Sequence, residues 1–408
     1  MVAPMNSTAR LAALSALSLT LAAPAPAEQA APPADRFTHD QMLVLDTHLD
    51  TPMLFEREGG WDFGELHRFE WDNSQVDLPR MAMGGLDGGF FVIYTAQGPL
   101  TAQGFRQARD SAFGRAAAIQ RVIGANRDRI GFATTAADAE RLQREGKAIA
   151  FQSIENSYPL GQDLSLLETF HRLGVRMAGP VHSKNNQLAD STTDKPRWKG
   201  LSPLGRRWVA EMNRLGMIVD GSHSSDAAFD QMLALSRAPI VLSHSGSSTM
   251  FKHPRNIDDE RLRRLAARGG VMFVNSLFLS PSGSSPERDA LEERHKQWEL
   301  LSPAERRQLV ADRAALDARL PFSTADFEIY MKSLLHSIRV MGPDHVGLGA
   351  DWDGGGGVIG MEDVSHLPKI TARLRAEGLS DADIAKIMGG NLLRVMRAVE
   401  AAAATPPR

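Results

Sequence analysis

Two potential metal ligands, His48 and Asp50, end an apolar run that begins at Leu43. The run has the composition of a buried strand, and Pro52 closes it. Side chains two positions apart on a strand point to the same side, so the imidazole and the carboxylate project together. An imidazole nitrogen beside a carboxylate oxygen is half of a hydrolytic metal site. A single His-x-Asp pair is more often a buried histidine with a surface aspartate, so the interpretation depends on matching ligands at other strand ends.

Further side chains of suitable chemistry follow other apolar runs, and these are Glu155, His182, His223, His244 and Asp351. In a parallel α/β barrel the C-terminal ends of the strands meet at the face that carries the chemistry. Five residues suit a centre of two ions, with His48 and Asp50 on one ion, His223 and His244 on the other, and Glu155 between them. Two divalent ions about 3.5–4 Å apart can share a hydroxide, which is a nucleophile at neutral pH, and can polarise the attacked carbonyl.

The chain has no cysteine, so nitrogen and oxygen are its metal ligands. Such ligands suit zinc, with manganese and cobalt as alternatives. For Glu155 the alternative role is helix capping or a salt bridge, and Lys184 is an alternative bridge as a modified lysine, disfavoured because Glu155 is available. Surface or packing roles are expected for nearly all of the other histidines, which are His39, His67, His171, His253, His295, His336, His345 and His366.

Eight short apolar segments alternate with helical patterns, which predicts an α/β fold of the (β/α)8 TIM-barrel type, as in metal-dependent hydrolases. The expected strands are 44–50, 87–94, 148–155, 175–182, 217–223, 240–245, 270–275 and 346–351. The expected helices are 102–126, 135–145, 164–173, 204–215, 226–236 and 258–268. A doubly wound open sheet shows the same alternation and is the alternative fold.

Two connections exceed the needs of a minimal barrel. One is residues 55–76, after the first strand, and the other is 279–322, between the seventh and eighth strands. The second opens with a Ser/Gly/Pro-rich stretch and continues with charged, helix-prone sequence, which predicts a helical insertion around 284–322. Long insertions in barrel enzymes commonly form lids and subunit contacts.

Residues 1–27 have the pattern of a signal peptide, with Arg10 before the apolar stretch 11–23 and Ala25-Pro26-Ala27 before the expected cleavage point. We therefore expect an exported, periplasmic or secreted protein with one catalytic domain at 28–408; an uncleaved membrane anchor is the alternative. No later stretch is long and apolar enough to span a bilayer. The 408 residues carry 46 basic and 49 acidic side chains, a net charge of −3 that gives no basis for binding nucleic acid.

At these residues the chain resembles the membrane dipeptidase (renal dipeptidase) family, zinc peptidases of the amidohydrolase superfamily. The matching segments run in the family's order over nearly the whole mature chain. They are Asp46-Thr47-His48-Leu49-Asp50, Gln75 to Arg80, Ile154-Glu155-Asn156, His182 to Asn186, Leu188 to Ser191, Asp220 to Asp226, Ser243-His244-Ser245, Arg255-Asn256, Gly349 to Gly354 and Gly390 to Val395.

The resemblance implies two Zn²⁺ per subunit on the five ligands named above. It also implies that His182 contacts the substrate and stabilises the tetrahedral intermediate, that Arg255 binds the substrate carboxylate, and that Asp351 is the catalytic proton shuttle. A guanidinium grips a carboxylate in bidentate fashion, and a carboxylate can pass a proton to a leaving amine. From the residues alone, Asp353 is an alternative shuttle and Arg255 an alternative salt-bridge residue at a helix entry.

The expected activity is therefore that of a zinc-dependent dipeptidase, including dipeptides with a C-terminal D-residue. The alternatives are another amidohydrolase activity, such as N-acyl-amino-acid deacylation, and a non-catalytic binding protein. A homodimer is implied by the resemblance alone. The chain departs from the mammalian members, which carry disulfides and a lipid anchor, and the 55–76 connection differs from the commonest pattern, so the side-chain preference stays open.

Overall fold

Parallel strands arranged in a ring form the centre of the computed structural model, which describes residues 39–57, 60–281, 283, 285–295, 301–320 and 323–404. Within the described residues the ring has eight strands, in the order in which they occur along the chain. They are β1 (Leu45–Leu49), β2 (Gly88–Tyr94), β4 (Ala148–Glu155), β5 (Val175–Ala178), β6 (Ile218–Val219), β7 (Val241–Ser247), β9 (Val271–Val274) and β10 (Val346–Leu348).

The ring is closed at two places that an open sheet would leave unpaired. The first strand, β1, pairs with β10 through Asp46 and Leu348, as well as with β2. On the far side, Asp220 just after β6 pairs with Val241 of β7, and the Gly221 amide donates to the Val241 carbonyl at 2.8 Å. The predicted (β/α)8 barrel is thus confirmed, and the open-sheet alternative is wrong.

Some strand bounds differ from the sequence prediction. The fourth predicted strand, β5, stops at Ala178 rather than at His182, because Gly179 is followed by Pro180, which has no amide hydrogen for a ladder. The fifth predicted strand, β6, stops at Val219, so His223 also lies in a loop. Two short strands outside the ring were not predicted: β3 (Ile130–Phe132) pairs with β4, and β8 (Asn256–Ile257) pairs with β7. Both are too short to show a periodic pattern.

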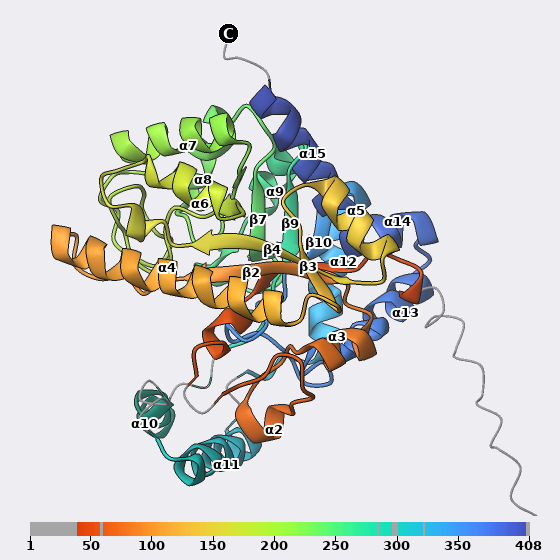
Figure 1. Cartoon of the computed structure of the whole chain (residues 1–408). Helices are drawn as coiled ribbons and strands as arrows, with labels where there is room; N and C mark the ends of the chain where they lie inside the picture. The colour runs from red at the N-terminus through yellow and green to blue at the C-terminus, as the bar shows by residue number, and fades with distance from the viewer. Residues whose placement is uncertain are drawn as a thin grey trace, which may run out of the picture. The chain divides into compact units, whose positions relative to one another are not determined.

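Helices surround the ring (Figure 1). The α-helices are α2 (Phe69–Asp72), α3 (Leu78–Gly84), α4 (Ala102–Ala125), α5 (Ala136–Arg144), α6 (Leu166–Arg172), α7 (Pro203–Leu215), α8 (Asp226–Leu235), α9 (Asp259–Ala267), α10 (Pro286–His295), α11 (Pro303–Arg319), α12 (Phe327–Met341), α13 (Pro368–Ala376), α14 (Asp381–Ala385) and α15 (Asn391–Ala404). Shorter turns are Thr51–Leu54, Tyr158–Leu160, Pro343–His345, Val364–His366 and the π-turn Lys386–Gly390. Ser202, Ser225 and Asp258 cap α7, α8 and α9 by accepting from a backbone amide in the first turn.

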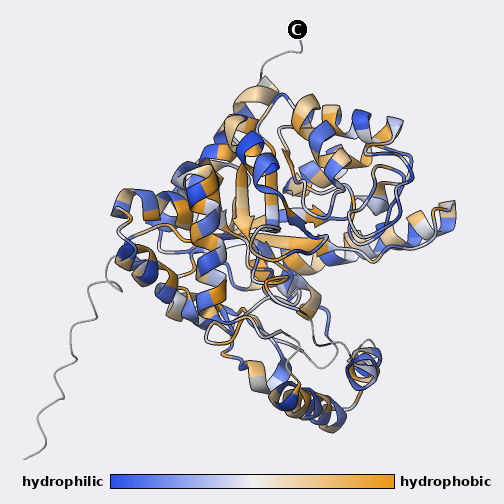
Figure 2. Cartoon of the chain, turned by 180° about the vertical axis from the view of Figure 1, so that it is seen from behind, coloured by the Kyte–Doolittle hydropathy of each residue, from blue (hydrophilic) through white to orange (hydrophobic). Residues whose placement is uncertain are grey.

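The core lies in and around the ring. Apolar residues concentrate in the central strands, and polar residues colour the outer sides of the helices (Figure 2). Phe90 of β2 stacks on Phe151 of β4 with ring centroids 5.1 Å apart. Leu392 and Met396 of α15 belong to the same apolar cluster. This burial fixes the strands, and with them the loops at their C-terminal ends.

The two long connections contact each other. The 55–76 connection contains α2, and the predicted helical insertion contains α10 and α11; α11 packs against α2 (Figure 1). Leu309 and Val310 of α11 form a small apolar cluster with Leu291 and Leu301. All described residues belong to one compact unit, 34–408, and the predicted signal peptide at 1–27 lies outside them. No helix among the described residues is long and apolar enough to cross a membrane.

Candidate metal centre

All eight predicted site residues gather at the C-terminal end of the barrel. His48 lies on β1 with Asp50 directly after it, Glu155 is the last residue of β4, and His244 lies on β7. His182, His223, Arg255 and Asp351 come from the segments that follow β5, β6, β7 and β10. The structure thus brings the predicted residues together, although five of the eight lie beyond the strands themselves.

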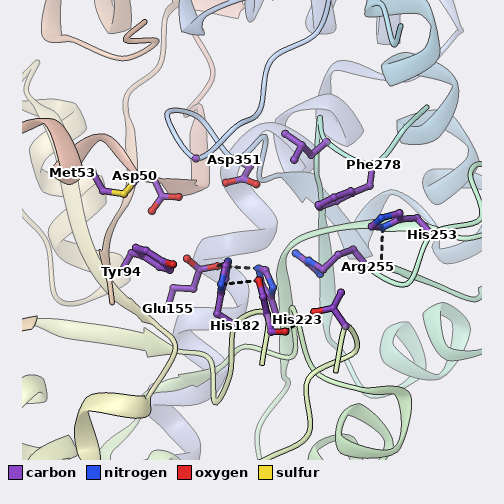
Figure 3. A pocket seen from close by; sticks show the side chains of 14 residues that line it. Asp50, Met53, Tyr94, Glu155, His182, His223, His253, Arg255, Phe278 and Asp351 are labelled. Carbon is purple, nitrogen blue, oxygen red and sulfur yellow. Dashed lines mark hydrogen bonds and ion pairs between the residues drawn. The ribbon is translucent and has the colours of Figure 1, made fainter. Parts of the chain in front are cut away.

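Glu155 is the centre of the cluster and lies beside His182 and His223 (Figure 3). Its two oxygens face different histidines. Oε1 lies 3.0 Å from Nε2 of His223 and 3.4 Å from Nε2 of His244. Oε2 lies 3.8 Å from Nε2 of His48. A carboxylate with one oxygen toward each group of ligands has the geometry of a bridge between two cations.

Two further carboxylates complete the side nearest His48. Nε2 of His48 lies 3.6 Å from Oδ2 of Asp50 and 3.9 Å from Oδ1 of Asp351. His182 approaches the opposite side of Glu155, with Nε2 at 3.9 Å from Oε1. His182 keeps 27% of its side chain exposed, whereas Glu155 keeps 7%, so the imidazole of His182 can reach a bound molecule.

The donor set fits divalent cations. Nε2 of His48 and Oδ1 of Asp50 are buried and have no hydrogen-bond partner, and the Nε2 atoms of His223 and His244 face each other at 2.8 Å. Buried polar atoms without partners are costly, and two imidazole nitrogens that converge on acidic oxygens are typical of a metal site. The four histidine nitrogens and three carboxylates, without sulfur, suit zinc.

Electrostatics support the same conclusion. Burial raises the pKa of Glu155 to about 7, against the lowering effect of His182 and His48, and burial likewise raises the pKa of Asp351 to about 6. Burial would lower the pKa of His48, but the carboxylates of Glu155, Asp50 and Asp351 raise it to about 10. Buried carboxylates that lie this close together either keep protons or bind cations. Divalent ions bound here would take the place of those protons.

A relay beneath the site sets the proton position on His244. Ser243 Oγ donates to Oδ2 of Asp220 at 2.6 Å, so it can only accept from Nδ1–H of His244, which lies 2.8 Å away. The lone pair of His244 is then on Nε2, the atom that faces Glu155. Burial and nearby positive charges lower the pKa of His223 and of His244 well below its usual range, which keeps both rings neutral, as metal ligands must be.

The backbone is strained where it presents two of these side chains. His223 and Asp351 both have φ of +66°, a region that non-glycine residues seldom adopt. Such conformations persist where surrounding contacts impose them, and they concentrate at functional sites. Gly354 passes so close to the carboxylates of Asp351 and Asp50 that a Cβ on it would overlap both. The absence of a side chain at 354 thus makes room for the acidic pair.

Arg255 lines the cavity from the side opposite Asp50 (Figure 3). Its Nη2 donates to the His244 carbonyl at 3.0 Å, and its Nε is buried without a partner. Burial lowers the pKa of the guanidinium, while Asp351 and Glu155 raise it. A buried guanidinium that lines the cavity, with a donor to spare and no carboxylate of the described residues in a salt bridge with it, can bind an anionic group.

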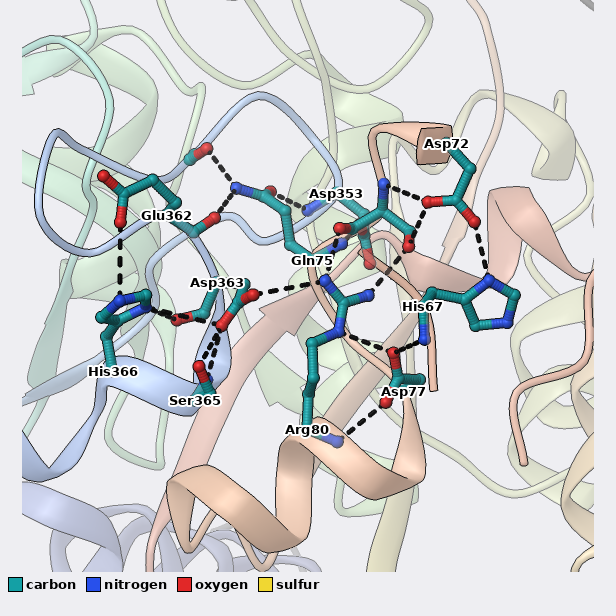
Figure 4. Close-up of polar contacts among 12 residues, drawn as sticks. His67, Asp72, Gln75, Asp77, Arg80, Asp353, Glu362, Asp363, Ser365 and His366 are labelled. Atoms are coloured by element: carbon teal, nitrogen blue, oxygen red, sulfur yellow. Dashed lines mark hydrogen bonds and ion pairs between the residues drawn. The ribbon is translucent and has the colours of Figure 1, made fainter. Parts of the chain in front are cut away.

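Lys184, the alternative metal bridge, and Asp353, the alternative proton shuttle, do not line the cavity. Lys184 is exposed and does not line it, which does not favour a bridging role. Asp353 lies beside Gln75 (Figure 4). It accepts from the Thr51 hydroxyl and from the Gln75 amide, both at 2.6 Å, so its carboxylate joins two segments. Asp351, not Asp353, faces the cavity.

The cavity has a volume of about 590 Å³, and its wall includes residues that the sequence did not single out. His253 was expected to have an ordinary role, yet it lines the cavity. The spacing of metal ligands cannot find such residues, because their side chains contribute shape rather than coordination; even Tyr94, at the end of β2, carries no typical metal ligand. The other unpredicted lining residues are Met53, Tyr94, Ser183, Thr193, Leu277, Phe278 and Gly354.

A closed parallel barrel with a buried His/Asp/Glu cluster at its C-terminal end defines a metal-dependent hydrolase. The family model of the membrane dipeptidases, peptidase family M19, matches residues 34–407. The chain belongs to this family of metallo-dipeptidases, which are hydrolases acting on peptide bonds.

Relatives and solved structures agree with this assignment. Dipeptidase tcpJ of Claviceps purpurea is 35% identical over 338 residues, which is 81% of this chain and 70% of that protein. The probable dipeptidase PvdM from Pseudomonas aeruginosa superposes with a TM-score of 0.77 at 32% identity, covering 90% of this chain and 98% of that one. A metallopeptidase from Rhodobacter sphaeroides was solved with a phosphinate mimic of the dipeptide L-Ala-D-Ala. It superposes with a TM-score of 0.69 at 26% identity, covering 88% of this chain and 99% of that one.

Proposed function

We propose that this metallo-dipeptidase hydrolyses dipeptides, including those with a C-terminal D-residue, with two Zn²⁺ per subunit. The observation that carries the proposal is the position of Glu155, whose two oxygens face His48 on one side and His223 and His244 on the other. His48 and Asp50 would hold one ion, His223 and His244 the other, and Glu155 both. A bound pair of divalent ions would supply a hydroxide nucleophile and polarise the scissile carbonyl.

The other residues have roles that follow from their positions. Arg255 holds the C-terminal carboxylate of the substrate, since its Nε is free of other partners and its guanidinium faces the cavity. This contact fixes the peptide bond over Glu155. Recognition of a free carboxylate in the same cavity as the candidate ligands would limit the substrate to one residue beyond the scissile bond, which is the defining property of a dipeptidase.

His182 and Asp351 act on the reacting atoms. His182 is the partly exposed histidine of the cluster, and its ring is positioned by Ser183, whose Oγ lies 2.9 Å from Nδ1. Its Nε2 donates to the oxygen that becomes negative in the tetrahedral intermediate, an interaction that strengthens in the transition state. Asp351 accepts the proton of the attacking water and returns it to the leaving amine.

Dipeptides with a free amino terminus are favoured over N-acyl amino acids by family membership, because the matching family and the curated relatives are dipeptidases. Tolerance of a D-residue is supported by the Rhodobacter sphaeroides relative, whose bound inhibitor mimics L-Ala-D-Ala.

The test is release of amino acids from a panel of dipeptides by the metal-loaded protein. The panel contains L,L and L,D pairs and an N-acetylated amino acid, assayed after chelation and again after zinc is restored. We expect zinc-dependent cleavage of both kinds of dipeptide, lost in His223→Ala. Cleavage of the acetylated compound alone would assign the protein as a deacylase, and no cleavage with two metals bound would overturn the proposal.

We further propose that residues 1–27 direct export to the periplasm or the medium and are removed, and that the enzyme is a homodimer. The proposal of export rests on Arg10, the apolar stretch 11–23 and the small residues Ala25-Pro26-Ala27 that follow it. The proposal of a homodimer rests on family membership. N-terminal sequencing of protein from each cell fraction tests the first. Light scattering on the purified protein tests the second.

A further inference from the structure

The cavity above the candidate metal centre has two chemically different sides (Figure 3). Asp50, Met53 and Tyr94 lie on one side, beside Glu155. Phe278 and His253 lie on the other, beside Arg255. A dipeptide bound with its carboxylate on Arg255 would therefore present its two side chains to different surroundings.

The side next to Arg255 is a flat aromatic wall. The ring of His253 stacks on Phe278 with centroids 4.3 Å apart and planes inclined by 11°. Cζ of Arg255 lies 5.6 Å from the centroid of Phe278, so the guanidinium and the wall are in contact. Leu277 extends the apolar lining. We call these three residues, His253, Leu277 and Phe278, the aromatic wall.

The wall is held by its own hydrogen bonds rather than by chance packing. Nδ2 of Asn256 donates to the Phe278 carbonyl at 2.9 Å and to the Phe251 carbonyl at 2.8 Å, which joins the two loops that carry the wall. Asn275 accepts from the Leu277 amide at 2.7 Å. Phe278 is thereby kept at a φ of +55°, a conformation a phenylalanine does not adopt without such support.

His253 contributes an uncharged face. Its Nδ1 accepts from the Arg255 amide at 3.2 Å, which leaves the ring proton on Nε2. Burial, together with the positive charge of Arg255, lowers the pKa of His253, so the ring is neutral at neutral pH. The wall therefore offers stacking and apolar contact, and it offers no charge to pair with an ionised side chain.

We propose that His253, Leu277 and Phe278 form the subsite for the side chain of the substrate's C-terminal residue, and that this subsite selects apolar and above all aromatic side chains. The inference rests on the proposed function, because it takes the carboxylate of that residue to be on Arg255. A side chain on the same α-carbon then lies within reach of the adjoining wall. A charged side chain would lose hydration there without gaining a partner.

The test compares kcat/KM for Gly-Phe, Gly-Leu, Gly-Ala and Gly-Lys, each with an L- or a D-residue at the C-terminus. We expect Gly-Phe to exceed Gly-Ala by about tenfold or more for at least one stereochemistry, and Gly-Lys to be the poorest, given that pocket contacts of this kind discriminate by about 10–200-fold. In Phe278→Ala the ratio of Gly-Phe to Gly-Ala should fall to about one, while Gly-Ala itself changes by less than about threefold.

Two comparison variants separate this effect from general damage. Met53→Ala, on the opposite side, should alter the ratio of Phe-Gly to Ala-Gly and leave the ratio of Gly-Phe to Gly-Ala as it is. Trp71→Ala removes an exposed aromatic side chain that does not line the cavity, and should alter neither ratio. Thermal melting verifies folding; if Phe278→Ala does not fold, Phe278→Leu should lower the ratio of Gly-Phe to Gly-Leu instead.

The outcomes distinguish the subsite from the activity. Absence of cleavage of every dipeptide by the metal-loaded wild type would overturn the proposed function. Cleavage without an apolar preference at the C-terminal position, or a preference that survives in both Phe278 variants, would overturn the subsite and leave the dipeptidase proposal intact.

Discussion

Ser243 Oγ lies 2.8 Å from Nδ1 of His244, and the same hydroxyl donates to a buried carboxylate of Asp220 at 2.6 Å. Asp220 also accepts from the Ser243 amide at 2.9 Å, so the carboxylate and the serine are fixed relative to each other. Neither residue faces the cavity, yet together they determine which nitrogen of His244 is free to bind a cation.

Breaking this relay should weaken metal binding without removing a ligand. Asp220→Asn lets the amide donate to Ser243, which no longer forces Nδ1 of His244 to carry the proton. We expect a loss of about 10–100-fold in affinity for the metal, as is typical for such outer contacts. Competition with a chromogenic chelator measures it, and Ser111→Ala, on the exposed side of α4, is the matched control. Unchanged affinity in Asp220→Asn would contradict the tautomer argument.

Gly354 provides a steric test of the acidic pair. Alanine at this position would overlap the carboxylates of Asp50 and Asp351, and both would have to move from their present positions. We expect Gly354→Ala to fold but to lose metal and activity by at least about tenfold, since small displacements of positioned groups are costly in catalysis. Gly124→Ala is the matched control, because a Cβ there meets no atom within 4 Å and alanine stabilises a helix by about 0.5–1 kcal/mol. Metal content and melting temperature are the measurements.

Asp351 and Asp353 should behave differently when their charge is removed. Asp351→Asn should lower kcat by about 10²–10⁴-fold, the usual contribution of a general acid–base, with little change in melting temperature. Asp353→Asn keeps an oxygen for the Gln75 amide and turns a donor toward the Thr51 hydroxyl, so activity should stay within about threefold of wild type. Asp353→Ala loses both bonds and should melt at a lower temperature. A larger loss of kcat in Asp353→Asn than in Asp351→Asn would reverse the assignment.

The sequence predicted the barrel because its eight ring strands lie in apolar segments that alternate with helices. These segments are recognisable even where the strand itself has two or three residues, as in β6 and β10. It also led to His48, Glu155 and His244, which lie on strands, and to Asp50, which follows one directly. The predictive power came from the rule that ligands gather at the C-terminal strand ends.

The remaining features depend on contacts between distant segments, which no local pattern records. The strain at His223 and Asp351 follows from the loops that hold them, not from their own residue types. The aromatic wall exists because Asn256 joins the loops of Phe251 and Phe278. Between β6 and β7 the ring is joined by the pairing of Asp220 with Val241, after a strand of only two residues.

The 55–76 connection contains a histidine, His67, whose two nitrogens both face acceptors, and Figure 4 shows one of them, Asp72. His67 Nδ1 lies 2.7 Å from a carboxylate oxygen of Asp72, and its Nε2 lies 2.8 Å from the Asp62 carbonyl. Trp61 stacks on the ring at 4.5 Å and donates to Asp72 as well. Both nitrogens can donate only in the imidazolium form.

This pair should make the connection less stable at alkaline pH. Burial alone would lower the pKa of His67, but Asp72 and the Asp62 carbonyl raise it. Burial alone would raise the pKa of Asp72, but His67 and Ser74 lower it to about 2. The contribution of His67 is complete below its unfolded pKa of about 6.5 and disappears as pH rises through the raised folded value. His67→Gln should therefore lower the melting temperature more at pH 5.5 than at pH 9. A difference that is equal at both pH values would show that His67 is neutral in the folded protein.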